Sequence, residues 1–175
     1  MATALDQVRA LIRDVPDFPQ PGILFKDLTP VLGDPAAFRA VIDELSARLR
    51  GKGFHRIVAI ESRGFLFGAP LADRLGLGIA PIRKLGKLPY KTERVQYALE
   101  YGTGILEAHV DAVKPGEKVA IVDDLLATGG TAAAAGELVR KAGATVGAYL
   151  FVVELLALHG REKLRGAEVD ALLAL

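Results

Sequence analysis

The sequence contains no cysteine among its 175 residues. Disulfide bonds, thiolate nucleophiles and cysteine-ligated metals are therefore excluded. A dominant charge of one sign is also lacking, because 22 Lys and Arg residues balance 21 Asp and Glu residues, giving a formal net charge of +1. Since these charges are mixed along the chain, we expect no nucleic-acid partner.

Long apolar runs are missing as well. The longest, residues 148–158, is interrupted by Glu154 and falls well short of the ~20 residues that a membrane-spanning helix needs. The first residues do not read as a signal peptide, since Leu5, Val8 and Leu11 recur on one face of an amphipathic helix. We therefore expect no membrane partner and a cytoplasmic location.

What is present is an ordinary globular composition, with 51% hydrophobic and 25% charged residues. This balance argues against disorder. A chain of this length can bury a substantial core, and we expect one domain over residues 1–175.

Short apolar segments alternate with helical patterns along most of the chain. Asp34 and Pro35 suit the N-cap and first position of a helix that should run to about residue 50. Further helices are expected over 64–75 and 131–142, and strands over 56–61, 79–84, 118–123 and 146–153. This alternation predicts an α/β fold with an open, mainly parallel sheet and helices on both faces.

The segment between these elements, around residues 85–104, follows a different pattern. Residues 94–101 roughly alternate between apolar and polar, which predicts a half-exposed strand in a hairpin that projects from the sheet. Residues 85–91 are polar and broken by glycine and proline, as is typical of a mobile lid.

The stretch VAIVDDLLATGGT, residues 119–131, carries the clearest chemistry. Asp123 and Asp124 come at the expected carboxyl end of a buried strand, where open α/β sheets bind ligands. The residues Ala127, Thr128, Gly129, Gly130 and Thr131 come at the start of the next helix. Unpaired N–H groups and the helix dipole favour an anion there, and glycines allow close approach of the backbone.

The kind of anion is limited by what this loop lacks. It has neither the GxxxxGK[ST] pattern of a P-loop nor the GxGxxG pattern of a dinucleotide site. Without a lysine the loop suits a monophosphate, and the carboxylates suit ribose hydroxyls one sugar-length away. The pattern indicates a ribose 5-phosphate site, although an aspartate that merely ends a strand before a capped turn is the alternative.

This stretch resembles the phosphoribosyl pyrophosphate (PRPP) signature of the type I phosphoribosyltransferase family. Further resemblance lies, in chain order, in FPQPGILFKD at 18–27, ESRGF at 61–65, IRK at 82–84, GKLP at 86–89, LEYG at 99–102 and GREKL at 160–164. These motifs are most similar to the members that act on adenine. The resemblance implies a single domain with an N-terminal hood over 1–33 and a lid hairpin over 85–104. It also implies a homodimer.

The implied reaction joins adenine to PRPP and yields AMP and pyrophosphate with Mg²⁺. By this resemblance Asp123 and Asp124 bind the ribose, and residues 127–131 bind the 5-phosphate. Pyrophosphate contacts are expected from Ser62, Arg63, Arg83, Lys84 and Lys87. Arg63 offers a forked donor for phosphate oxygens and is also expected to act in catalysis.

Glu100 is the expected general acid or base for the purine proton, by its match to the family glutamate in LEYG. Leu24, Phe25 and Lys26 are expected to contact adenine, although Lys26 stands where relatives often carry arginine. No ligand spacing links the three histidines, so we expect no protein metal site. The Mg²⁺ would be held mainly by PRPP oxygens and water.

Two other functions stay open from the sequence. One is transfer to a different base: hypoxanthine, guanine or xanthine. The other is a regulator that senses nucleotides without catalysing a reaction; such proteins would be expected to carry a DNA-binding extension, which this chain does not display.

Overall fold

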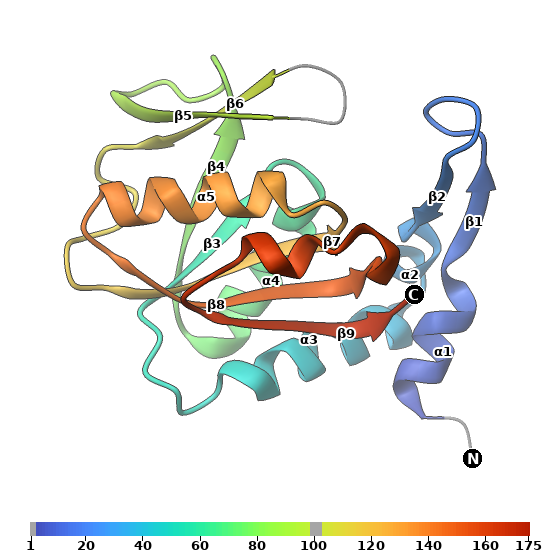
Figure 1. Ribbon diagram of the computed structural model, residues 1–175. Helices are drawn as coiled ribbons and strands as arrows, with labels where there is room; N and C mark the ends of the chain where they lie inside the picture. Colours follow the sequence, from blue (N-terminus) through green and yellow to red (C-terminus); the bar gives the residue numbers. More distant parts are fainter. Residues whose placement is uncertain (1–2, 99–102) are drawn as a thin grey trace. The chain divides into compact units, whose positions relative to one another are not determined.

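The computed structural model describes residues 3–98 and 103–175 (Figure 1). The chain divides into two compact units, Met1–Glu44 and Leu45–Leu175. The expectation of one phosphoribosyltransferase domain over 1–175, with a hood over 1–33 and a lid over 85–104, stays a prediction. In the part of the chain that is described, no helix has the length and apolar character to cross a membrane.

The first unit begins with α1 (Ala4–Leu11), which a Thr3–Asp6 capping box starts. The strands β1 (Arg13–Pro16) and β2 (Leu24–Asp27) form an antiparallel pair. The short helix α2 (Thr29–Gly33) follows. The sequence patterns predicted α1 but neither the hairpin nor α2, because strands of four residues carry too little periodicity to be recognised.

The helix α3 (Pro35–Leu49) confirms the predicted start at Asp34, whose Oδ1 accepts hydrogen bonds from the Ala36 and Ala37 N–H groups at 2.9 and 2.8 Å. It runs across the boundary between the two units.

The second unit is built on a seven-stranded sheet with the order β5-β6-β4-β3-β7-β8-β9. Its elements are β3 (Arg56–Ile60), α4 (Arg63–Leu75), β4 (Gly78–Lys84), β5 (Thr92–Ala98), β6 (Thr103–His109), β7 (Lys118–Leu126), α5 (Gly130–Lys141), β8 (Thr145–Glu154), the 3-10 segments η1 (Leu156–Leu158) and η2 (Gly160–Lys163), and β9 (Glu168–Ala174). Strands β4, β3, β7, β8 and β9 pair in parallel, whereas β5 and β6 pair antiparallel. The predicted fold class is confirmed.

Helices cover the two faces of this sheet (Figure 1). Side chains alternate along β3, so Val58 and Ile60 join the cluster that contains the α5 residue Leu138. On the opposite face, Gly68 of α4 lies so close to β3 that an added methyl group would be 2.6 Å from the Ala59 Cβ. This burial on both faces explains the continuous apolar runs in the central strands.

The position of Asp123 and Asp124 differs from the prediction. They were expected at the carboxyl end of a strand over 118–123, but β7 continues to Leu126 through its pairing with β8. On its other side, pairing with β3 stops at Val122. The two aspartates therefore lie inside β7 but beyond the last β7 residue that pairs with β3.

The starts of β3 and β7 are joined by an ion pair in which Arg56 donates to Glu117 at 3.0 and 3.1 Å. The Arg56 side chain lowers the pKa of Glu117 to about 2, against an ordinary value of about 4.3. Because the pKa is lower in the folded state, this pair stabilises the fold above about pH 4.3, and the contribution is lost as the pH falls towards 2.

We expect Glu117→Gln to lower the free energy of unfolding by about 1–3 kcal/mol at pH 7, the range for hydrogen bonds to charged groups. The gap to wild type should shrink steadily between pH 5 and pH 3, as measured by urea unfolding. The control Glu137→Gln removes an exposed pair with Lys141 and should cost under about 0.5 kcal/mol. A gap that does not change with pH would contradict the assignment.

Candidate active site

A pocket of about 340 Å³ opens where β3 and β7 end in the second unit. It brings together most of the residues predicted for PRPP, although they come from distant parts of the sequence. The predicted residues that line it are Ser62, Arg63, Lys84, Asp123, Asp124, Ala127, Thr128, Gly129, Gly130 and Thr131. Ten of the predicted residues therefore lie together in one pocket.

The carboxylate pair is held by backbone and side-chain contacts. Asp124 is 2% exposed and accepts a short hydrogen bond from the Arg63 Nε. Asp123 Oδ1 accepts the Asp124 N–H at 2.9 Å. Burial raises the pKa of Asp123 well above its ordinary range, and the neighbouring Asp124 charge raises it further. The Arg63 guanidinium balances the Asp124 charge beside the anion loop, residues 127–131.

The anion loop leads from β7 into α5, whose N-cap is Gly129. Gly129 has φ 77°, a left-handed conformation that side chains rarely adopt. Its carbonyl accepts the Ala133 N–H at 2.9 Å and so begins the helix. This geometry leaves the first N–H groups of α5 without partners within the helix, as an anion site requires.

Arg63 and Gly64 begin α4 on the opposite wall. A methyl group at Gly64 would lie 2.8 Å from the Val122 carbonyl oxygen and 2.9 Å from Asp123 Oδ1. Only glycine therefore allows α4 to start this close to the carboxylates. The close approach places the guanidinium of Arg63 beside Asp124.

Arg83 was predicted to contact pyrophosphate, but it does not line the pocket among the described residues. Its guanidinium donates instead to the carboxylate of Glu61, at 3.0 and 3.3 Å, and to the Lys87 carbonyl at 3.0 Å. Glu61 also accepts the Lys84 N–H at 2.9 Å. Burial acts to raise the pKa of Glu61, but the hydrogen bonds from Arg83 and Lys84 leave it below its ordinary value.

Lys87 likewise does not line the pocket among the described residues. Its backbone is held by Glu107, which is 1% exposed. One oxygen of Glu107 accepts the N–H groups of Lys87 and Leu88 at 3.0 and 3.2 Å, and Arg94 lies 3.4 Å from the other. Burial acts to raise the pKa of Glu107, yet these contacts hold it below its ordinary value.

The residues predicted to contact adenine lie on β2, in the first unit. Leu24 is half exposed. Phe25 packs edge to face against Phe18 with ring centroids 5.1 Å apart. Lys26 forms an ion pair with Asp14 at 2.6 Å. Glu100, the predicted acid or base, lies outside the described residues.

Sequence reasoning assigned no role to seven residues that line the pocket: Glu61, Tyr97, Leu106, Leu125, Leu126, Ala132 and Phe151. Tyr97 belongs to the predicted alternating strand. The pattern placed Tyr97 on the apolar face of that strand but did not indicate that this residue lines the pocket. Leu106 and Phe151 are almost fully buried and read as ordinary core residues. Glu61 came within the quoted ESRGF motif, but only its neighbours were assigned a role.

The possible metal ligands of the pocket are its carboxylates. Over residues 3–98 and 103–175, no three His, Cys, Asp or Glu side chains gather as a metal cluster. Asp123 and Asp124 offer the oxygen atoms that Mg²⁺ prefers, and this ion usually keeps several waters and binds through one or two carboxylates plus substrate phosphates. The residues present therefore fit an ion that is shared with a phosphorylated substrate.

The fold and the pocket together define an open α/β protein whose candidate site lies at the carboxyl ends of its strands, where such sheets bind ligands. Residues 32–170 match the phosphoribosyl transferase domain. The chain belongs to the phosphoribosyltransferase family.

Relatives and solved structures agree over nearly the whole chain. It is 58% identical to an adenine phosphoribosyltransferase of Anaeromyxobacter sp. (strain Fw109-5), over 99% of this chain and 98% of that one. It is 52% identical, with a TM-score of 0.95, to the adenine phosphoribosyltransferase structure from Thermoanaerobacter pseudethanolicus, covering 98% and 99% of the two chains. The Saccharomyces cerevisiae enzyme, solved with adenine and an imino-altritol bisphosphate, is 43% identical with a TM-score of 0.93, covering 98% and 99%.

We expect Glu107→Gln to loosen the segment that Glu107 holds, because the amide loses the charge that strengthens the Lys87 and Leu88 hydrogen bonds and places an NH₂ group beside Arg94. Amide hydrogen exchange at Lys87 and Leu88 should accelerate roughly tenfold, the factor for losing about 1.4 kcal/mol of a charged hydrogen bond. The control Glu93→Gln alters an exposed neighbour on β5 and should leave both amides unchanged. Faster exchange spread evenly over the whole sheet would indicate general destabilisation instead.

Proposed function

We propose that this protein transfers the 5-phosphoribosyl group of PRPP to adenine, producing AMP and pyrophosphate in purine salvage. The observation that carries the proposal is the single pocket that combines paired carboxylates with an anion loop at a helix start. The extensive identity to adenine phosphoribosyltransferases supports it. The yeast structure described with adenine supports the choice of base.

The 5-phosphate binds the N–H groups and hydroxyls of residues 127–131, and the ribose hydroxyls bind Asp123 and Asp124. Ser62, Arg63 and Lys84 bind the pyrophosphate, whose negative charge grows as it leaves C1′. Arg63 stabilises that charge while it remains beside Asp124. Mg²⁺, when bound, neutralises part of the pyrophosphate charge, and Asp123 and Asp124 are the protein carboxylates placed to contact it or its waters.

The base carries the remaining proton chemistry. Adenine forms a bond from its ring nitrogen to C1′ as the C1′–pyrophosphate bond breaks, and the purine then loses a proton. Glu100 is the residue proposed to accept it. Leu24, Phe25 and Lys26 are proposed to contact the base. Arg83 and Lys87 serve in this proposal by fixing the wall and the lid rather than by contacting pyrophosphate directly.

The use of Mg²⁺, a cytoplasmic location and a homodimer also belong to the proposal. They rest on resemblance to the family and on the composition of the chain.

A competition assay tests the choice of base. With PRPP and Mg²⁺ present, equal concentrations of adenine, hypoxanthine, guanine and xanthine should give AMP as the dominant product. Because a site built to bind the 6-amino group of adenine rejects 6-oxo purines, we expect preference by a factor of about 10⁴. Dominant formation of another nucleotide would assign the chain to that base. PRPP binding without turnover on any base would favour the nucleotide-sensing alternative.

The division of roles within the site predicts different kinetic effects for two sets of variants. Glu100→Gln should lower kcat by about 10²–10⁴-fold, the usual contribution of positioned proton transfer, with little change in the KM for PRPP. The double variant Asp123→Asn with Asp124→Asn should mainly raise the KM for PRPP, because it removes the ribose acceptors. Full turnover in both would show that these residues are assigned wrongly.

A further inference from the structure

The motif GREKL, at residues 160–164, contributes no residue to the lining of the pocket. It forms η2 and follows η1 in the segment that joins β8 to β9. Residues 155–164 are called the prop segment below. It lies beside the anion loop, and the contact is made at Gly160.

Gly160 touches the anion loop backbone to backbone. A methyl group at Gly160 would overlap the carbonyl oxygen of Ala127 and lie 2.9 Å from the backbone nitrogen of Gly129. Conversely, a methyl group at Gly129 would overlap the carbonyl oxygen of Gly160 and lie 3.0 Å from its carbonyl carbon. Two chains approach this closely only where neither has a Cβ atom.

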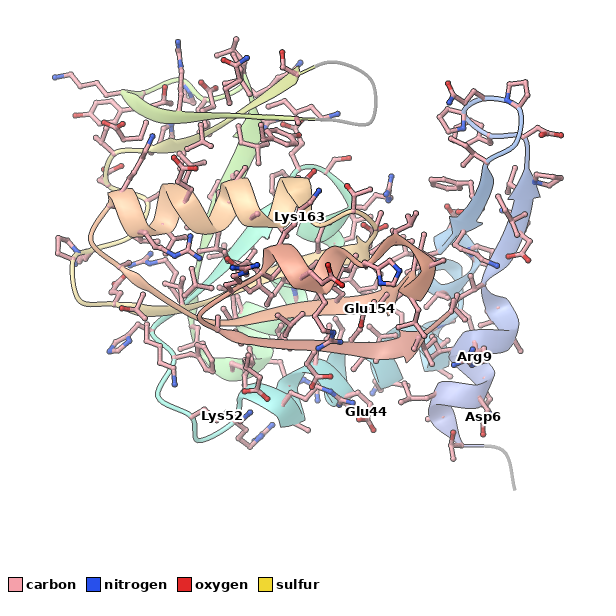
Figure 2. All side chains as sticks on the ribbon, viewed as in Figure 1. Asp6, Arg9, Glu44, Lys52, Glu154 and Lys163 are labelled. Carbon is pink, nitrogen blue, oxygen red and sulfur yellow. The ribbon has the colours of Figure 1, made fainter. Side chains whose placement is uncertain are left out.

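The prop segment is itself fixed to the sheet. The Leu155 N–H donates to the Leu126 carbonyl at 2.9 Å, at the end of β7. Arg161 forms a forked pair with Glu154, and it also donates to the Val169 carbonyl of β9. Glu154 is 5% exposed and is labelled in Figure 2 on β8, with Lys163 on η2.

The far end of the prop segment is also anchored, since Leu164 is 3% exposed and belongs to the cluster that packs under α5. The segment is thus tied to β7, β8, β9 and the core. Because Gly160 has no side chain, its backbone is the part of the prop segment that contacts the loop.

We propose that Gly160 is a positioning residue for the 5-phosphate: through the prop segment, the Glu154–Arg161 pair holds a backbone surface that sets the conformation of residues 127–129. This inference rests on the proposed function, which assigns the 5-phosphate to this loop. A phosphate is bound there by N–H groups that must point at one place before it arrives. A rigid support beneath the loop reduces the ordering that binding would otherwise cost.

The proposal predicts that Gly160→Ala weakens ligands that carry a 5-phosphate and spares the base. The added methyl group must displace Ala127 or Gly129, so at least one backbone N–H group of the loop no longer points at the phosphate. The Kd of AMP and the KM for PRPP should rise roughly ten- to hundredfold, the factor for losing one hydrogen bond to a charged group. The KM for adenine, measured at saturating PRPP, should change less than about threefold. Calorimetry and steady-state kinetics on the full chain give these values.

Gly166→Ala is the matched control in the same part of the chain. Gly166 has φ 81° and nothing within 4 Å of an added methyl group, so this substitution strains the backbone without touching the loop. It should lower the melting temperature yet leave the Kd of AMP unchanged. If both variants weaken AMP binding equally, or if Gly160→Ala leaves it unchanged, the positioning role is wrong.

A second variant, Arg161→Lys, tests the proposal if Gly160→Ala does not fold. Arg161→Lys keeps the positive charge beside Glu154 but loses the planar fork. It should weaken AMP binding by about threefold or more without a matching change in the KM for adenine, and unchanged AMP binding would overturn the proposal. Wild type is the separate check: if it neither binds AMP nor consumes PRPP, the proposed function fails, whatever the variants do.

Discussion

Two adjacent aspartates in a buried strand are the constraint on which the site depends. Asp123 and Asp124 repel each other, and burial together with the Asp124 charge raises the pKa of Asp123. The fold reduces this cost in two ways. Pairing of β7 with β3 stops at Val122, so beyond this residue β7 pairs with β8 alone, and both aspartates line the pocket. Arg63 then donates directly to Asp124. The carboxylates can therefore lie a few residues from the anion loop without preventing that loop from binding an anion.

Close backbone approach is the second requirement of this arrangement. At Gly64 it brings the start of α4 against β7, and at Gly129 and Gly160 it brings the prop segment against the anion loop. Each contact depends on the absence of a Cβ atom rather than on any attractive group. Packing of this kind defines a site because a displaced backbone moves every N–H group that it carries.

Much of this could be predicted from sequence, for physical reasons. The central strands are buried on both faces and read as continuous apolar runs, and glycine and Asp-Pro signals set the limits of α3, α4 and α5. The carboxylates and the anion loop lie within one short stretch, so a ribose 5-phosphate site could be predicted from that stretch without knowledge of tertiary contacts. The β1–β2 hairpin and β6 were not predicted, because short or mixed strands lack a clear period. The extent of β7 depends on its partner β8, and no local pattern encodes a partner.

Contacts that depend on tertiary partners were the ones that the sequence did not indicate. Arg83 looks like a free cation at a strand end, yet Glu61 takes its charge. Glu107 looks like a polar residue on an exposed hairpin, yet it is buried and accepts two backbone N–H groups of residues 87 and 88.

Together these contacts form one connected path. It runs from Glu61 in the wall of the pocket, through Arg83 to the Lys87 carbonyl, and from the Lys87 N–H to Glu107. Glu107 then reaches Arg94 on β5, the strand that leads towards Glu100. The hydrogen bonds of Arg83 and Glu107 therefore connect the wall of the pocket to the segment predicted as the lid. In this protein the element expected to move is tied to the wall that its substrate would contact.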